Sequence, residues 1–203
     1  MLWTGAQKLL RSDDRGETWR ERSPDLSTNN ATKIAGEGHI RYCTITTHAE
    51  SHLQQGLVWA GTDDGRVWST PNGGESWSEH TQALAAAGAP IDRWTSRVVP
   101  SRHSKDRAYV AKSGYRRDDF VPYLYVTDDG GATWRSITGL QGEAASLPEA
   151  PISVVLEDPT NPNLLFVGND FGVWASLDRG LRWFRLSTQL PTAPVRDLAI
   201  QER

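Results

Sequence analysis

The sequence lacks features that identify several classes of protein. Its 203 residues include a single cysteine, Cys43, which excludes an internal disulfide and a multi-cysteine metal site. No run of 18 apolar residues is present, and the first residues show neither the basic region nor the apolar core of a secretory signal. The net charge of -3 lacks the basic excess typical of nucleic-acid binding. We therefore expect no membrane span and no nucleic-acid partner. The sequence does not indicate a cellular compartment.

Tryptophan, by contrast, is abundant, and several of the 9 copies recur at intervals. Four segments share the pattern [ST]-x-[DN]-x-G-x-x-W, and their tryptophans are 58, 57 and 49 residues apart. Four matches in one chain indicate an internal repeat. The four sets are Ser12, Asp14, Gly16 and Trp19; Thr70, Asn72, Gly74 and Trp77; Thr127, Asp129, Gly131 and Trp134; Ser176, Asp178, Gly180 and Trp183.

The repeated pattern is typical of a tight turn between two strands. An Asp or Asn side chain accepts hydrogen bonds from nearby backbone N–H groups, and glycine supplies a positive φ. Short runs rich in β-forming residues precede each turn, so a complete unit predicts four antiparallel strands, as in a propeller blade. The box acids are thus interpreted as turn clamps. The expected blades cover 1–23 (completed by 194–201), 41–80, 94–138 and 151–187.

Two arrangements of these blades remain open. In the first, the chain is part of a larger propeller and packs against further blades of a longer chain. In the second, residues 194–201 complete the first blade and close a four-bladed ring. The first is favoured because four-bladed rings lie at the lower limit of propeller size.

These turns resemble the Asp-box (BNR) repeats of β-propellers in sialidases, xyloglucanases, photosystem II assembly factors and sortilin-type receptors. The surrounding sequence is closest to bacterial sortilin-like or glycosyl-hydrolase-like Asp-box propeller proteins. The resemblance implies an all-β propeller with about four blades, but no particular activity, because the repeat occurs in enzymes and in non-enzymes. The resembling stretches are 19–27, 58–65, 115–123, 157–168 and 169–176.

Function in such a fold is expected in the blade-top loops and the channel mouth. We expect a non-catalytic module that binds a protein, peptide or glycan ligand. Neither a cofactor nor a metal is expected, since the histidines are scattered. The candidate binding residues are Trp94, Arg97, Arg116, Asp119, Glu157 and Asp170.

The alternative function is glycoside hydrolysis of the xyloglucanase type. That chemistry needs two carboxyl groups about 5 to 10 Å apart across a cleft, one of them protonated. Acids on or after the expected inner strands, or in the loop after a second strand, are the candidates, but no spacing in the sequence pairs any two. These acids are Asp92, Glu157, Asp158, Asp170 and Asp197. A structural repeat segment without its own ligand is a third possibility.

Overall fold

The computed structural model describes residues 1–36, 40–139, 145–186, 189 and 191–201. The strands in this part of the chain form four antiparallel sheets, which confirms the all-β prediction. None of the described helices is long and apolar enough to cross a membrane.

Each sheet is a meander in which consecutive strands pair. The first sheet contains β1 (Leu2–Gly5), β2 (Leu9–Ser12) and β3 (Arg20–Glu21); the second contains β4 (Ile45–Glu50), β5 (Val58–Thr62), β6 (Val67–Thr70) and β7 (Ser78–Glu79). The third contains β8 (Trp94–Pro100), β9 (Ala108–Gly114), β10 (Asp119–Thr127) and β11 (Arg135–Ser136); the fourth contains β12 (Ile152–Glu157), β13 (Leu165–Asn169), β14 (Gly172–Ser176) and β15 (Phe184–Arg185). The other elements are α1 (Ala31–Ala35), α2 (Thr81–Ala86) and the 3-10 turn η1 (Tyr115–Arg117).

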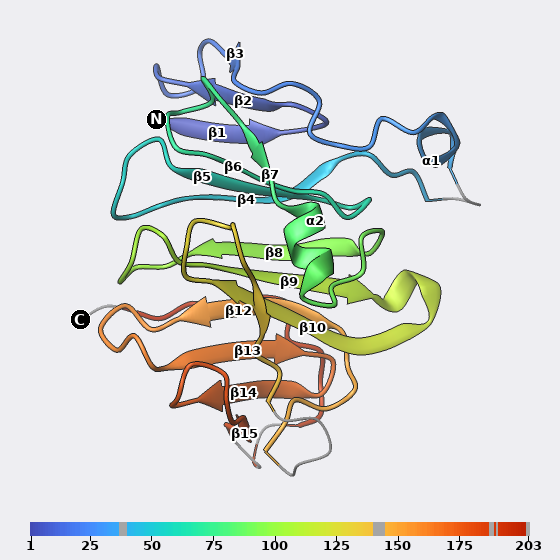
Figure 1. Ribbon diagram of the computed structural model, residues 1–203, viewed down its shortest axis with the longest axis vertical. Coiled ribbons are helices and arrows are strands. Elements are labelled where there is room, and N and C mark those ends of the chain that lie inside the picture. The colour runs from blue at the N-terminus through green and yellow to red at the C-terminus, as the bar shows by residue number, and fades with distance from the viewer. Residues whose placement is uncertain (37–39, 140–144, 187–188, 190, 202–203) are drawn as a thin grey trace.

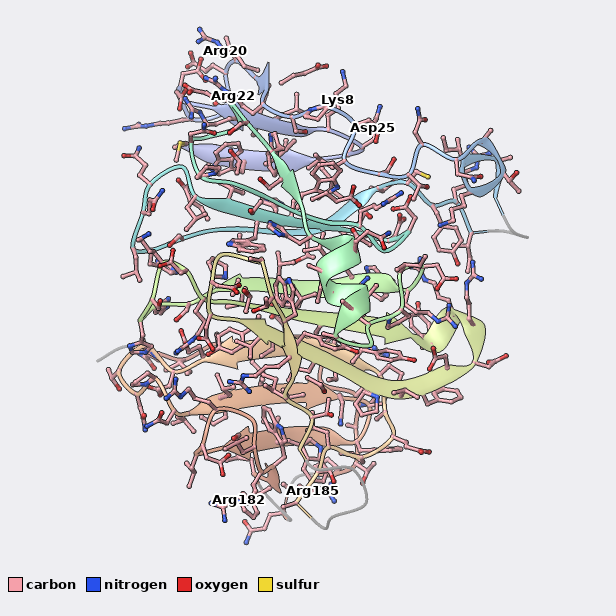
Figure 2. The ribbon with its side chains drawn as sticks, viewed as in Figure 1. Lys8, Arg20, Arg22, Asp25, Arg182 and Arg185 are labelled. Atoms are coloured by element: carbon pink, nitrogen blue, oxygen red, sulfur yellow. The ribbon has the colours of Figure 1, made fainter. Side chains whose placement is uncertain are left out.

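The sheets are stacked face to face in chain order, and their strands run across the stack (Figure 1). Apolar side chains fill the three spaces between neighbouring sheets. Figure 2 shows Arg20 and Arg22 at one end of the stack and Arg182 and Arg185 at the other. The first and fourth sheets therefore lie at opposite ends of an open arc.

Each Asp-box turn lies between the last two strands of its sheet. In the first turn, Ser12 Oγ accepts the Gly16 N–H at 2.7 Å, and Asp14 Oδ1 accepts the Thr18 N–H at 2.9 Å. The other three turns repeat this geometry, with Asn72 replacing the acid in the second. Hydrogen bonds from Thr133 lower the pKa of Asp129 to about 2. The acids of these turns are therefore occupied in holding the backbone.

The box glycine is also the point where one sheet touches the preceding sheet. A Cβ atom on Gly131, whose φ is +96°, would collide with the His80 ring of the second sheet. Two of the box indoles also bind the preceding sheet, since Trp77 donates to the Arg22 carbonyl and Trp183 to the Ile137 carbonyl. Trp134 instead donates to the Gly131 carbonyl of its own turn. The repeat thus sets the spacing between sheets as well as the turn.

Residues 194–201, which the sequence assigned to the first blade, lie elsewhere in the structure. They adopt no regular strand, and the first sheet has only its three strands in the described residues. The Val195 N–H donates to the Asn169 carbonyl of β13 at 2.9 Å. The segment lies beside the fourth sheet because the arc is open and the first sheet is at the far end (Figure 1).

We predict that Gly131→Ala lowers the free energy of unfolding by about 3 kcal/mol or more, because strain at positive φ adds to the collision with His80. The His80 ring has no room to move, since it is buried and Ser69 Oγ lies 2.8 Å from its Nε2. Gly130→Ala in the same turn is the matched control. Its φ is +72°, and nothing lies within 4 Å of an added Cβ, so the expected cost is about 1 kcal/mol. Urea unfolding of both variants measures the difference, and equal losses would contradict the packing role.

Candidate functional site

Loops of the second and third sheets meet at one end of the strands and enclose a small cleft. Tyr42 precedes β4, Asp63 follows β5, Trp94 begins β8, and Tyr115 and Arg116 follow β9. We call these five residues the rim cluster. The antiparallel register brings them together, because it places the start of each inner strand beside the end of its neighbour. The cleft is lined by Tyr42, Asp63, Asp92, Arg93, Trp94, Ser113, Gly114, Arg116 and Arg117.

Arg116 lies at the centre of the rim cluster, among three aromatic rings. Its guanidinium carbon is 4.9 Å from the ring centre of Trp94, 5.7 Å from that of Tyr115 and 5.8 Å from that of Tyr42. Such contacts attract a cation to the ring faces. Arg116 Nε donates to the Tyr115 hydroxyl at 3.2 Å. Among the described residues, no oxygen accepts a hydrogen bond from its terminal N–H groups, so they are available to a ligand.

Asp63 places a carboxyl group in the same cleft. Its Oδ1 accepts the backbone N–H groups of Cys43 and Thr44 at 2.8 and 2.9 Å. Cys43 has a φ of +79°, which is strained for a residue other than glycine and turns its N–H towards this carboxyl. Burial raises the pKa of Asp63. Its second oxygen receives no hydrogen bond from the described residues and is the free acceptor of the cleft.

A network of arginines and acids supports the cleft on the side of the third sheet. Arg93 donates to Asp119 Oδ2 at 2.8 Å and to Asp92 Oδ1 at 2.7 Å. Arg117 lies 3.6 Å from the other oxygen of Asp92, and the Tyr123 hydroxyl donates to Asp119 at 3.0 Å. Asp92 and Asp119 therefore each form an ion pair with Arg93, whereas Asp63 forms no ion pair among the described residues.

Lys112 contacts the two loops that lie on either side of the cleft. Its side chain is fully buried, and its ammonium group donates to the Gly65 carbonyl at 2.7 Å and to the Pro90 carbonyl at 2.9 Å. Gly65 lies in the turn after Asp63, and Pro90 lies in the loop that leads to Trp94. Lys112 thus fixes the distance between the two loops that carry the cleft.

Three of the six candidate binding residues lie in or beside the rim cluster: Trp94, Arg116 and Asp119. Arg97 instead pairs with Asp197 at 2.9 Å, and Asp170 lies 3.4 Å from Arg196. Both therefore contact the C-terminal segment.

Glu157 lies apart from the cleft, at the far end of the strands. Only 2% of it is exposed, and it accepts hydrogen bonds from Ser101 Oγ, the Arg102 N–H and the Tyr109 hydroxyl at 2.7 Å each. A carboxylate with three donors and almost no exposure holds the third sheet to the fourth. Its place at the end of an inner strand put it among the candidates, but that end is opposite to the cleft.

Three residues of the rim cluster were not singled out for binding in the sequence: Tyr42, Asp63 and Tyr115. Asp63 precedes Asp64 and Gly65, and such a sequence is typical of an ordinary turn. The sequence feature that could have marked Asp63 as a binding residue is its position directly after an apolar strand. Tyr115 adjoins Arg116 in a charged loop. A solvated loop does not need an aromatic residue, so Tyr115 is the feature that could have indicated a binding site.

Comparisons with known proteins agree with this fold. The BNR/Asp-box repeat model matches residues 125–136, the third turn. No curated protein matches the chain in sequence. The chain thus carries Asp-box repeats on strands arranged in propeller blades, as predicted from its sequence.

Solved structures match over nearly the whole chain. An ancestral GH74 enzyme is 16% identical over 92% of this chain and 22% of its own, with a TM-score of 0.64. The GH74 xyloglucanase from Xanthomonas campestris is 20% identical over 92% of this chain and 28% of its own, with a TM-score of 0.63. A computationally designed protein, Ika8, is 14% identical over 98% of this chain and 49% of its own, with a TM-score of 0.55. The chain therefore spans about a quarter of the two GH74 proteins, and the TM-scores show a shared propeller fold.

The buried position of Lys112 predicts a pH dependence of stability. Burial lowers the pKa of its ammonium group to about 7, against an ordinary value of 10.5. Between these values the unfolded chain binds more protons than the folded chain, so the free energy of unfolding rises with pH. We predict a rise of about 2 kcal/mol from pH 7 to pH 9 that Lys112→Met lacks. Urea unfolding at both pH values measures it, and parallel pH profiles for the two proteins would refute it.

Proposed function

We propose that this arc of Asp-box blades is a recognition module and that the rim cluster binds a saccharide through its hydroxyl groups. One observation carries the proposal. The free N–H groups of Arg116 and the free oxygen of Asp63 belong to the same cleft, beside the ring of Trp94. Donor, acceptor and apolar surface are the three features that a sugar ring requires.

The chemistry favours a hydroxyl-rich ligand over a simple ion. A hydroxyl group donates to Asp63 while it accepts from Arg116, so one or two neighbouring hydroxyls satisfy both residues. An anion would meet Asp63 as a like charge, and a cation would meet Arg116. The cleft is small, so it takes one substituent of the sugar. The rest of the ligand then lies over Tyr115, which is 43% exposed.

Fold neighbours lend this proposal some support. One protein of similar fold is a xyloglucanase, so a propeller of this kind is compatible with glycan binding. At 20% identity the likeness concerns the fold, and the ligand of this chain rests on its own residues.

Glycoside hydrolysis is the second candidate, and a specific observation favours it. Asp63 has a raised pKa, which suits a general acid, and Asp92 lines the same cleft. Asp92 is bound by Arg93 and flanked by Arg117, so it is poorly placed to act as a base. In this candidate, the second carboxyl group would have to come from outside the described residues.

We predict that Arg116→Ala weakens the binding of xyloglucan oligosaccharides at least tenfold, because the substitution removes the guanidinium N–H donors and one of the side chains that line the cleft. Arg20→Ala is the matched control, since Arg20 is exposed on β3 at one end of the stack (Figure 2). Isothermal titration with xyloglucan oligosaccharides and with a panel of neutral polysaccharides measures both variants. If no saccharide binds, or if both variants bind equally well, the proposal fails.

The two candidates are separated by Asp63→Asn. As a binding residue, Asp63 keeps part of its role as an amide, so we expect affinity to fall less than tenfold and the chain to release no reducing ends. Reducing-end release by the unaltered chain that disappears in Asp63→Asn, with binding retained, would establish hydrolysis instead.

A further inference from the structure

The fourth Asp-box turn differs from the other three in its exposed side chains. Leu177 and Leu181 occupy its second and sixth positions and are 68% and 62% exposed, the highest values among the large apolar side chains of the described residues. The other three turns carry charged or smaller residues at these two positions, so the turn does not require leucine. These residues are Asp13 and Glu17, Pro71 and Glu75, and Asp128 and Ala132.

The exposure of the two leucines does not depend on what lies beyond the fourth sheet. The second and third sheets are each followed by another sheet (Figure 1), and the same turn positions are nevertheless exposed in both. These positions are Pro71, Glu75, Asp128 and Ala132. A further sheet in the same arrangement would therefore leave Leu177 and Leu181 at the surface.

The two leucines line a groove of about 570 Å³ at the outer edge of the third and fourth sheets. Arg135, which begins the outer strand β11, lines it from the third sheet, and Asn163 lines it from the turn between β12 and β13. Asp178 and Arg179 of the box turn complete the lining. The antiparallel register places the box turns at the end of the strands opposite to the rim cluster. The groove is thus separate from the saccharide site.

Arg179 holds a backbone conformation that favours glycine. Its φ is +58°, and the corresponding residues of the second and third turns are Gly73 and Gly130, with φ of +69° and +72°. Its backbone N–H donates to the Asn163 carbonyl at 3.0 Å, and its side chain forms no ion pair among the described residues. A charged side chain therefore strains the turn without a contact inside the described fold, which points to a contact with a ligand.

The charges of the groove favour an anionic ligand. The carboxyl group of Asp178 is already bound, because Oδ1 accepts the Arg182 N–H at 2.9 Å and Oδ2 accepts Arg182 Nε at 2.8 Å. Arg135 lies 3.9 Å from Asp128, which is too far for a hydrogen bond. Two arginines thus line the groove beside one acid that is paired with a third arginine.

We propose that this groove binds an acidic peptide segment of another protein. A carboxylate of the peptide pairs with Arg135 and Arg179, and an apolar side chain of the peptide packs on Leu177 and Leu181. The side-chain amide of Asn163 both donates and accepts, so it suits a peptide bond. A peptide is the occupant because acidic and apolar groups lie side by side along one narrow chain, whereas a lipid surface is broad and flat. The proposal does not rest on saccharide binding.

Selection from a library of short random peptides displayed on phage identifies the probe. We expect the enriched peptides to carry acidic residues on either side of a leucine, isoleucine or phenylalanine. One enriched peptide is then synthesised with a fluorescent label, and fluorescence anisotropy measures its affinity for the full chain. The absence of any enriched peptide, or the enrichment of basic or uncharged peptides, overturns the proposal.

The double variant Leu177→Asp, Leu181→Glu tests the apolar contact. The first turn carries Asp and Glu at the same two positions, so the fourth turn is expected to keep its fold. Binding of the labelled peptide should weaken about tenfold or more, because the apolar contact is lost and like charges are added. Pro71→Asp places the same two acids on the second turn, beside Glu75, and is the matched control with unchanged affinity. Unchanged affinity in the double variant refutes the proposal.

Arg179→Gly separates binding from folding. The second and third turns already have glycine here, so the loss of strain offsets the greater freedom of glycine in the unfolded chain, and resistance to urea should not fall. Affinity for the labelled peptide should fall about fivefold and depend less on salt. Arg15→Gly makes the same change in the first turn, where φ is +64°, and should leave affinity unchanged. Equal affinities for the two variants contradict the proposal.

Vesicles that contain phosphatidylserine test the other anionic partner, a lipid surface. We expect the chain to remain in solution when these vesicles are sedimented. Sedimentation that is lost in Leu177→Asp, Leu181→Glu would identify a membrane as the occupant of the groove and overturn the peptide proposal.

Discussion

The structure depends on a close contact in which the backbone of one Asp-box turn lies against the preceding sheet. Gly74 meets the Arg22 carbonyl, Gly131 the His80 ring and Gly180 the Ile137 side chain, each at a distance that excludes a Cβ atom. The glycines have a positive φ, which the turn also needs. One residue type thus satisfies two constraints, and the repeated pattern fixes both the shape of a blade and its distance from the next.

The rim cluster depends on that spacing. Arg116 on the third sheet reaches Tyr42 before the second sheet only because the two sheets are held at this separation. Lys112 adds a direct connection, through two carbonyls, between the loops on either side. The cluster is therefore preorganised by packing outside the cleft, and its free donor and acceptor remain for a ligand.

The sequence predicted the propeller fold because the evidence is local. The box turn is specified within eight consecutive residues, and its hydrogen bonds join residues two to four apart. The site is not local. Tyr42, Asp63 and Arg116 come together through the register of two sheets, which no short pattern reveals. Glu157 shows the converse, since an acid at the end of an inner strand was taken to face the channel, whereas Ser101 and Tyr109 bury it.

Nuclear magnetic resonance of the indole N–H groups tests directly whether a ligand is recognised at the rim cluster. A titration with xyloglucan oligosaccharides is predicted to shift the signal of Trp94, whose indole donates to Thr46 Oγ1 beside the cleft. The signal of Trp183, buried and bonded to the Ile137 carbonyl, should stay in place. An unchanged Trp94 signal, or shifts confined to the exposed Trp19 of the first sheet, would contradict recognition at the rim cluster.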